Sequence, residues 1–156
     1  RGLGDVYKRQ LFEDIVLDIY GKGPDLTSIE QAISDNSLQN NVKLKGIDKE
    51  IANKISNYDA LIIASTHDAF PNVLIEAMNA GVVPISTKVG DCEWLLSENR
   101  GIFINGFDPE SIYLSIKEFY EMDLNQKNTI IKNGRNLINQ NLSEEKILKD
   151  WLEILF

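Results

Sequence analysis

DALIIASTHDAFPNVLIEAMNAGVVPIST, residues 59–87, contains two apolar runs on either side of a helical pattern. Residues 59–65 are almost continuously apolar, which is typical of a strand covered on both faces. In residues 71–80 the apolar side chains recur at helical spacing: Leu74, Ala77 and Met78. Residues 82–87 are apolar again and predict a second strand. A strand, a helix and a strand in this order predict a parallel pair with a right-handed crossover.

The segments on either side repeat this alternation. Further strands are predicted at 15–20, 41–45 and 101–105. Helices are predicted at 24–33, 48–55, 71–80, 93–96 and 108–120, and two more helices at the end of the chain, the second opened by Ser143. This pattern predicts an α/β fold of the doubly wound kind, with a parallel sheet. Ligands of such folds bind beyond the carboxyl ends of the strands, so the loops after those ends are the candidate site.

Composition excludes several functions. The chain has 156 residues and a formal net charge of -8, which argues against nucleic-acid binding and against contact of this segment with an anionic membrane. No apolar run approaches the ~20 residues of a membrane span. The single cysteine, Cys92, excludes an internal disulfide and fits a reducing compartment. We expect a cytoplasmic protein, or one peripheral to the inner face of the membrane through a part outside this segment.

The first ten residues differ in kind from the rest of the chain. DVYKRQ, residues 5–10, resembles the in-frame translation of a transposon end used to build sequencing libraries. A natural basic arm is the alternative. We expect residues 1–10 to be non-native and residues 11–156 to form one incomplete domain, with terminal helices over 108–156. The chain would then be a fragment truncated at the N-terminal edge of its sheet.

Residues 68–76 carry the chemistry that the sequence predicts. The backbone N–H groups of Asn72, Val73 and Leu74 lie in the first turn of a helix, where they have no intrahelical acceptor. A phosphate or diphosphate suits such a position. The carboxylate of Glu76, about one turn further in, can accept hydrogen bonds from vicinal hydroxyls such as those of a ribose. Asp68, before the helix, can bind other hydroxyls or offset developing positive charge.

DAFPNVLIEAMNAG, residues 68–81, resembles the pattern E-G-F-x-x-V-L-x-E-A-M-A-x-G of retaining GT-B glycosyltransferases of group 1, also called family 4. Three further segments agree in order and context: DIYGKGP at 18–24, NNVKLKG at 40–46 and PISTKVGD at 84–91. The similarity extends from about residue 15 to residue 105, and more loosely to the end of the chain. It implies the Rossmann-like, donor-binding half of a GT-B fold.

The resemblance implies a function and a set of site residues. The reaction would transfer a sugar with retention from a UDP- or GDP-sugar to a glycan or lipid-linked acceptor, without a cofactor or metal. Glu76 would hold the ribose and Asp68 the donor sugar. The other implied donor-binding residues are Gly21, Gly23, Gly46, Ile47, Phe70, Pro71, Asn72, Val73 and Leu74. The acceptor domain and the family's diphosphate-binding Arg and Lys would belong to a missing N-terminal part.

Departures from the family pattern and other interpretations stay open. Asp68 stands where the family usually has Glu, and Ala69 where it has Gly, which leaves the identity of the sugar open. A stand-alone module that binds a nucleotide or nucleotide sugar without turnover is the alternative function. His67 is interpreted as a polar loop residue, and the two tryptophans, Trp94 and Trp151, as core residues.

Overall fold

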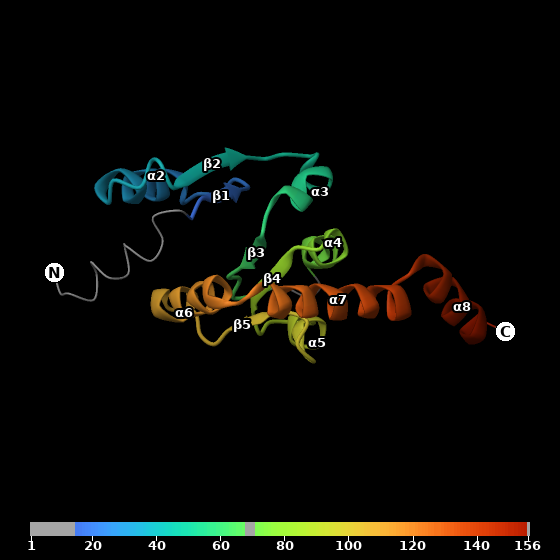
Figure 1. The fold of residues 1–156 in the computed structure, drawn as a ribbon. Helices are drawn as coiled ribbons and strands as arrows, with labels where there is room; N and C mark the ends of the chain where they lie inside the picture. The colour runs from blue at the N-terminus through green and yellow to red at the C-terminus, as the bar shows by residue number, and fades with distance from the viewer. Residues whose placement is uncertain (1–14, 68–70, 156) are drawn as a thin grey trace. The chain divides into compact units, whose positions relative to one another are not determined.

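The computed structural model describes residues 15–67 and 71–155 of the chain. The chain divides into two compact units, Arg1–Glu50 and Ile51–Phe156. Figure 1 shows the alternation of strands and helices along both. All five described strands pair in parallel, which confirms the α/β class. They form a two-stranded and a three-stranded ladder, where the sequence predicts a single sheet.

The first unit contains β1 (Leu17–Tyr20), α2 (Leu26–Asp35) and β2 (Val42–Gly46). β1 and β2 pair in register from Leu17 opposite Val42 to Tyr20 opposite Gly46, with one irregularity before Tyr20. No described residue of this unit is fully buried. Pro24 was expected in the first helical turn, but α2 begins two residues later, after Asp25 at the N-cap.

The second unit holds the larger part of the fold. Its elements are α3 (Ile51–Lys54), a 3₁₀ turn (Ile55–Asn57), β3 (Ala60–Ile63), α4 (Asn72–Ala80), β4 (Val83–Thr87), α5 (Cys92–Leu96), β5 (Ile102–Ile104), α6 (Pro109–Glu121), α7 (Leu124–Asn141) and α8 (Glu144–Leu155). The strands lie in the order β3-β4-β5. Every predicted helix and strand is therefore confirmed, with boundaries that shift by a few residues.

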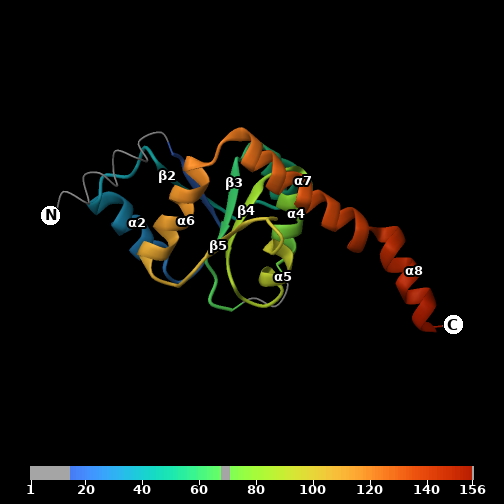
Figure 2. The ribbon, with the colours of Figure 1, turned by 60° about the horizontal axis from the view of Figure 1, so that its bottom comes forward.

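Both faces of the three-stranded ladder are covered by helices (Figure 2). One cluster of buried side chains joins α4, α5 and the second half of α7, and includes Leu74, Met78 and Leu95. A second cluster joins the strands to the first half of α7 through Ile85 and Ile130, with α6 packed against it. The helix that follows β3 is thus held by a continuous apolar core.

Burial along the strands differs from the sequence prediction. Every residue of β4 is buried, whereas the residues of β3 are only half-buried. Full coverage was expected for residues 59–65, and that expectation is wrong. β4 is the central strand of the described ladder, so it has a neighbour on each edge, and β3 has a ladder partner on one edge only.

The terminal helices begin where the sequence predicts. Asp108 caps α6 by accepting a hydrogen bond from the Ser111 N–H, 3.0 Å between N and Oδ1, and Pro109 occupies the first helical position. The hydroxyl of Ser143 accepts from the Lys146 N–H at the start of α8. α7 packs on the ladder and on α4.

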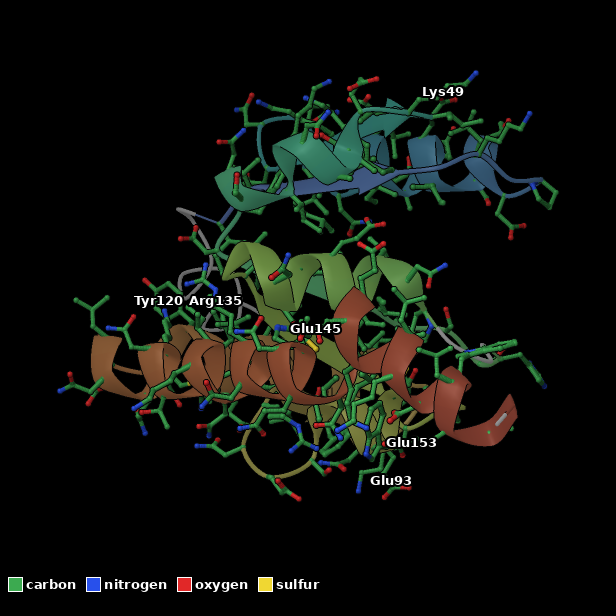
Figure 3. All side chains as sticks on the ribbon, turned by 90° about the vertical axis from the view of Figure 1, so that its right-hand side faces the viewer. Lys49, Glu93, Tyr120, Arg135, Glu145 and Glu153 are labelled. Carbon is green, nitrogen blue, oxygen red and sulfur yellow. The ribbon has the colours of Figure 1, made fainter. Side chains whose placement is uncertain are left out.

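Two aromatic residues are not where the sequence predicts. Trp94 is 42% exposed and Trp151 is 64% exposed, so neither is a core residue. On α8 the charged residues Glu145 and Glu153 are exposed as well (Figure 3).

None of the helices in residues 15–67 and 71–155 combines the length and apolar character that crossing a membrane requires.

Candidate functional site

The first turn of α4 lies just after the carboxyl end of β3. Pro71 is buried at the N-cap with an extended backbone, φ -77° and ψ 100°. Asn72 is exposed and Val73 is half-buried. Because these two residues open α4, their backbone N–H groups have no acceptor within the helix. The helix dipole adds partial positive charge there, which favours an anion.

Leu74 differs from the sequence prediction. Its N–H was expected to lack an acceptor, but it donates to the Pro71 carbonyl oxygen at 3.0 Å. Its side chain is fully buried in the core between α4, α5 and α7. Leu74 therefore anchors the helix, and its N–H is not available to a ligand.

Glu76 is exposed on α4, one turn after the helix starts. The neighbouring Ala77 and Met78 are buried, so the core face and the acidic residue are on different sides of the helix. No described side chain forms an ion pair with the Glu76 carboxylate, which leaves its oxygens open to hydroxyl donors. The second predicted acid, Asp68, lies outside the described residues, as do Ala69 and Phe70.

The predicted glycine-rich rim belongs to the first unit. The Gly21 N–H donates to the Gly46 carbonyl oxygen at 2.8 Å, so the structure brings the carboxyl ends of β1 and β2 together. Gly21 has a φ of +126°, a conformation that L-residues with a side chain rarely adopt. Gly23 is exposed, and Ile47, which comes directly after β2, is 61% exposed. The exposed apolar side chain of Ile47, beside this turn, can pack against a planar ring of a ligand.

Sequence patterns assign no role to Thr87, although it lies at the same edge of the ladder as the start of α4. Its buried hydroxyl donates to the Ser65 carbonyl oxygen at 2.6 Å. In the sequence, the only feature that indicates this hydrogen bond is a threonine at the end of a predicted buried strand. His67 is exposed, and its Nδ1 lies 3.0 Å from the Thr66 hydroxyl, which fits the interpretation as a polar loop residue.

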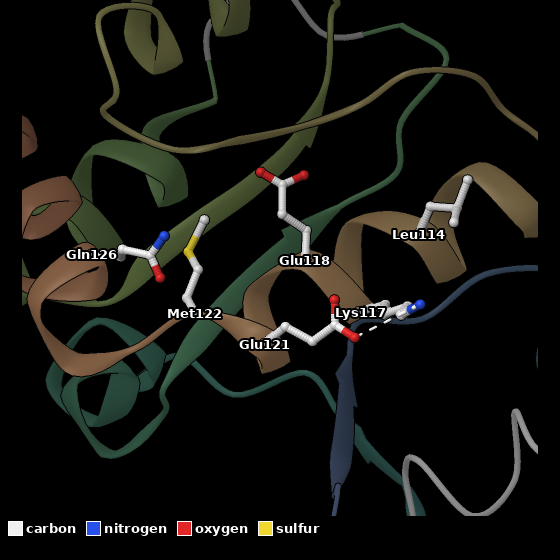
Figure 4. A pocket seen from close by; sticks show the side chains of 6 residues that line it. All are labelled: Leu114, Lys117, Glu118, Glu121, Met122 and Gln126. Atoms are coloured by element: carbon white, nitrogen blue, oxygen red, sulfur yellow. Dashed lines mark ion pairs between the residues drawn. The ribbon is translucent and has the colours of Figure 1, made fainter.

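Other candidate sites differ from this one in position or chemistry. Within the residues that the structure describes, no group of three or more His, Cys, Asp or Glu side chains could hold a metal ion. A shallow pocket of about 400 Å³ lies on α6 and the start of α7 (Figure 4). Its lining residues are Leu114, Lys117, Glu118, Glu121, Met122 and Gln126. None of the predicted donor-binding residues lines this pocket.

Curated relatives resemble this chain along nearly all of its length. It is 23% identical to the lipopolysaccharide core biosynthesis glycosyltransferase LpsD of Rhizobium meliloti, over 98% of this chain and 48% of that protein. It is also 23% identical to the GtfA subunit of a UDP-N-acetylglucosamine–peptide N-acetylglucosaminyltransferase of Streptococcus agalactiae, over 94% of this chain and 30% of that protein. The chain thus spans less than half of the length of these two relatives.

Solved structures resemble the whole described fold. A glycosyltransferase from Rickettsia africae superposes with a TM-score of 0.82 and 23% identity, over 97% of this chain and 42% of that chain. Anabaena HepE in complex with UDP superposes with a TM-score of 0.81 and 22% identity, over 90% of this chain and 40% of that chain. These likenesses show that the fold is a Rossmann-like half of the GT-B type.

The family model described as "Glycosyl transferases group 1" matches residues 5–137. This range includes the α4 segment and both described ladders. It also includes residues 5–10, whose origin stays a prediction. Because the model matches well over half of the chain, the protein belongs to the group 1 glycosyl transferases.

Proposed function

We propose that this chain binds the nucleotide-sugar donor of a retaining glycosyltransferase. The donor would be a UDP- or GDP-sugar, and the acceptor a glycan or a lipid-linked molecule. The observation that carries the proposal is the arrangement on α4. Two N–H groups without an acceptor in the helix, at Asn72 and Val73, and one exposed carboxylate, at Glu76, occur within the first turn and a half of a helix that follows a strand of a parallel ladder.

The two parts of this arrangement match the two parts of a nucleoside diphosphate. The amides at the start of α4 would donate to the diphosphate, whose negative charge the helix dipole favours. Glu76 is about 6 Å further along the axis, at 1.5 Å per residue. Side chains on a helix lean toward its N-terminus, so the carboxylate can reach the ribose hydroxyls beside that diphosphate.

The remaining predicted residues are proposed for donor contacts in each unit separately. Asp68 would bind the donor sugar, with Phe70 and Pro71 beside it. Gly21, Gly23, Gly46 and Ile47 would line the region of the base, where the turn after β1 and the exposed Ile47 side chain offer close backbone approach and apolar contact.

The proposed chemistry needs orientation and electrostatics more than a reactive side chain. Holding the donor in one geometry lowers the entropic cost of reaching the transition state. The amides at the start of α4 would stabilise the charge that builds on the leaving diphosphate. The proposal includes no metal and no cofactor. The acceptor would be bound by an N-terminal domain outside this chain, and the protein would act in the cytoplasm, with any membrane contact made by that domain.

The relatives support a UDP-linked donor in particular. The name of the Streptococcus agalactiae relative contains UDP-N-acetylglucosamine. Anabaena HepE has been solved in complex with UDP and, in another structure, with UDP-glucose. We therefore choose UDP as the first probe.

The first experiment is a calorimetric titration of the chain with UDP. Glu76→Gln removes the charge but keeps the shape, and it should weaken UDP binding about tenfold or more, because hydrogen bonds to a charged group are worth about 1.5–3 kcal/mol. Glu145→Gln, an exposed glutamate in the first turn of α8, is the matched control and should bind like the wild type. Equal affinity of wild type and Glu76→Gln would contradict the assignment of Glu76.

A second experiment separates an enzyme from a stand-alone binding module. The longest reading frame that encodes this chain is incubated with UDP-glucose and UDP-N-acetylglucosamine, and released UDP is measured. Transfer with the same anomeric configuration in donor and product, determined by proton NMR, supports a retaining enzyme. Binding without release of UDP, with either donor and with added glycan acceptors, favours the non-catalytic module.

A further inference from the structure

The hydroxyl of Thr87 joins two strand ends at the edge of the ladder where the site lies. Thr87 is the last residue of β4 and is 1% exposed. Its Oγ1 donates to the Ser65 carbonyl oxygen at 2.6 Å, two residues after the end of β3. The paired residues of β3 and β4 end at Ile63 opposite Ser86, so this bond lies beyond the last pair.

After this bond the two chain segments separate. The Val89 N–H donates to the Thr87 carbonyl oxygen, and the Cys92 N–H to the Val89 carbonyl oxygen, both at 3.0 Å. This tight turn carries the β4 end into α5, whereas the β3 end continues toward Pro71 and α4. A crevice at the carboxyl edge of a parallel sheet requires such a divergence of neighbouring segments.

We propose that Thr87 is a positioning residue of the donor site, and this inference rests on the function proposed above. Its hydroxyl holds Ser65, where the chain leaves β3 toward the site helix. The other end of that connection is held by Leu74, which is fully buried. With both ends held, the amides of Asn72 and Val73 keep one position relative to the ladder.

A purely structural role predicts a different result from a positioning role. The Ser65 carbonyl is partly buried, so the loss of its donor destabilises the fold in either case. Only a positioning role also weakens ligand binding by molecules that are fully folded, because misplacement of binding groups lowers affinity without unfolding. UDP affinity, measured well below the melting temperature, therefore separates the two roles.

The test compares three variants with the wild type. Thr87→Val is nearly isosteric and lacks the hydroxyl, whereas Thr87→Ser keeps it. Ser115→Ala is the matched control, because Ser115 is also buried and its hydroxyl donates to the Ile112 carbonyl oxygen within α6 at 2.8 Å. We expect Thr87→Val to weaken UDP binding about tenfold, and the other two variants to stay within about twofold of the wild type.

The outcomes are distinguishable. A lower melting temperature of Thr87→Val with unchanged UDP affinity overturns the inference and leaves the donor site intact. If the wild type does not bind UDP, the proposed function fails, and amide hydrogen exchange of Thr66 and His67 in the ligand-free protein decides about Thr87. Faster exchange of these two amides in Thr87→Val but not in Thr87→Ser supports the role of Thr87 in positioning residues 65–67. Exchange at the same rate in Thr87→Val and the wild type overturns it. If Thr87→Val does not fold, Thr87→Ala, which also lacks a donor, takes its place in the same comparison.

Discussion

Arg100 is a buried charged residue that closes the C-terminal end of α5. It is 5% exposed. Its guanidinium and Nε donate to the carbonyl oxygens of Trp94 and Leu95 at 2.6 and 2.9 Å, and to the carboxylate of Glu98 at 2.7 Å. Carbonyl groups at a helix end have no partner within the helix, and a cation is favoured there by the dipole. Arg100 thus stabilises the turn between α5 and β5.

Replacement of Arg100 should destabilise the protein strongly. Arg100→Met keeps the apolar stem but leaves several partly buried acceptors without donors, so we expect a loss of about 2–4 kcal/mol in the free energy of unfolding. Urea denaturation followed by circular dichroism measures it. Glu98→Gln is the control: Glu98 is exposed, so its loss should cost at most about 1 kcal/mol. If both variants lose a similar amount of unfolding free energy, the stabilisation comes from the ion pair between Arg100 and Glu98 and not from the hydrogen bonds of Arg100 to the end of α5.

At the scale of elements, α4 is held at both of its ends. Gly81 comes directly after the helix, with a φ of +84°. A Cβ at this position would lie 2.5 Å from Nη2 of Arg135, whose Nε donates to the Asn79 carbonyl oxygen at 3.1 Å. α7 therefore contacts the last turn of α4 through Arg135, and the glycine leaves the space that this contact needs.

Gly81→Ala should destabilise the protein by about 1–2 kcal/mol, because a left-handed backbone conformation is unfavourable for alanine. The clash with Arg135 adds to this cost only if the flexible guanidinium cannot move. Thermal unfolding measures the effect. Gly23→Ala is the control, since Gly23 has open space around its Cβ position and no positive φ; its unfolding should match the wild type. An unchanged melting temperature of Gly81→Ala would contradict the argument.

The cap of α6 should make stability depend on pH. The pKa of Asp108 lies below its usual value of 3.8, mainly because the Ser111 hydroxyl donates to its carboxylate, and then because the Ser111 N–H does so. A carboxyl whose pKa is lower in the folded state stabilises fully above its unfolded pKa and loses that effect as the pH falls toward the folded value. The contribution of Asp108 should therefore be complete above about pH 4 and disappear below.

Urea denaturation of the wild type and of Asp108→Asn, at pH values above and below about 4, tests the prediction. Their difference in unfolding free energy should become smaller as the pH falls, because asparagine does not titrate. Ser111→Ala should weaken the pH dependence, since the hydroxyl is the main cause of the shift. A difference that does not vary with pH would mean that Asp108 acts only through its shape.

At the scale of the whole molecule, the two units differ in how much core they contain. All three clusters of buried apolar residues belong to Ile51–Phe156. The described part of the first unit is one helix and a two-stranded ladder without a fully buried residue. A ladder of two strands is at best marginally stable by itself.

The two units should therefore behave differently as separate fragments. Residues 51–156 should fold alone and unfold cooperatively, because the described clusters of buried apolar side chains all lie within this unit. Residues 1–50 alone should give the narrow amide dispersion of an unfolded chain in proton–nitrogen NMR spectra. Dispersed signals from the fragment 1–50, or an unfolded fragment 51–156, would contradict this account.

Local patterns were enough to predict most of the elements and the site helix. Asp108, Ser143 and Gly81 mark helix ends through hydrogen bonds and backbone conformations that involve only near neighbours in sequence. The spacing from Pro71 to Glu76 likewise predicts an exposed carboxylate one turn into a helix. The resemblance to the family pattern adds the proposed kind of ligand, because the same short segment carries both the helix start and the acid.

Tertiary packing decided what no local pattern contains. β3 and β4 are both apolar, and only the order β3-β4-β5 makes β4 the fully buried one. Trp94 is exposed because α5 buries Cys92, Leu95 and Leu96 instead. Trp151 is exposed because none of the described residues of α8 is buried, although tryptophan is apolar enough for a core. The contact between Thr87 and Ser65 joins residues 22 apart in sequence, and it exists only once the two strands pair. Burial and long-range hydrogen bonds depend on which segments meet, and composition alone does not specify that.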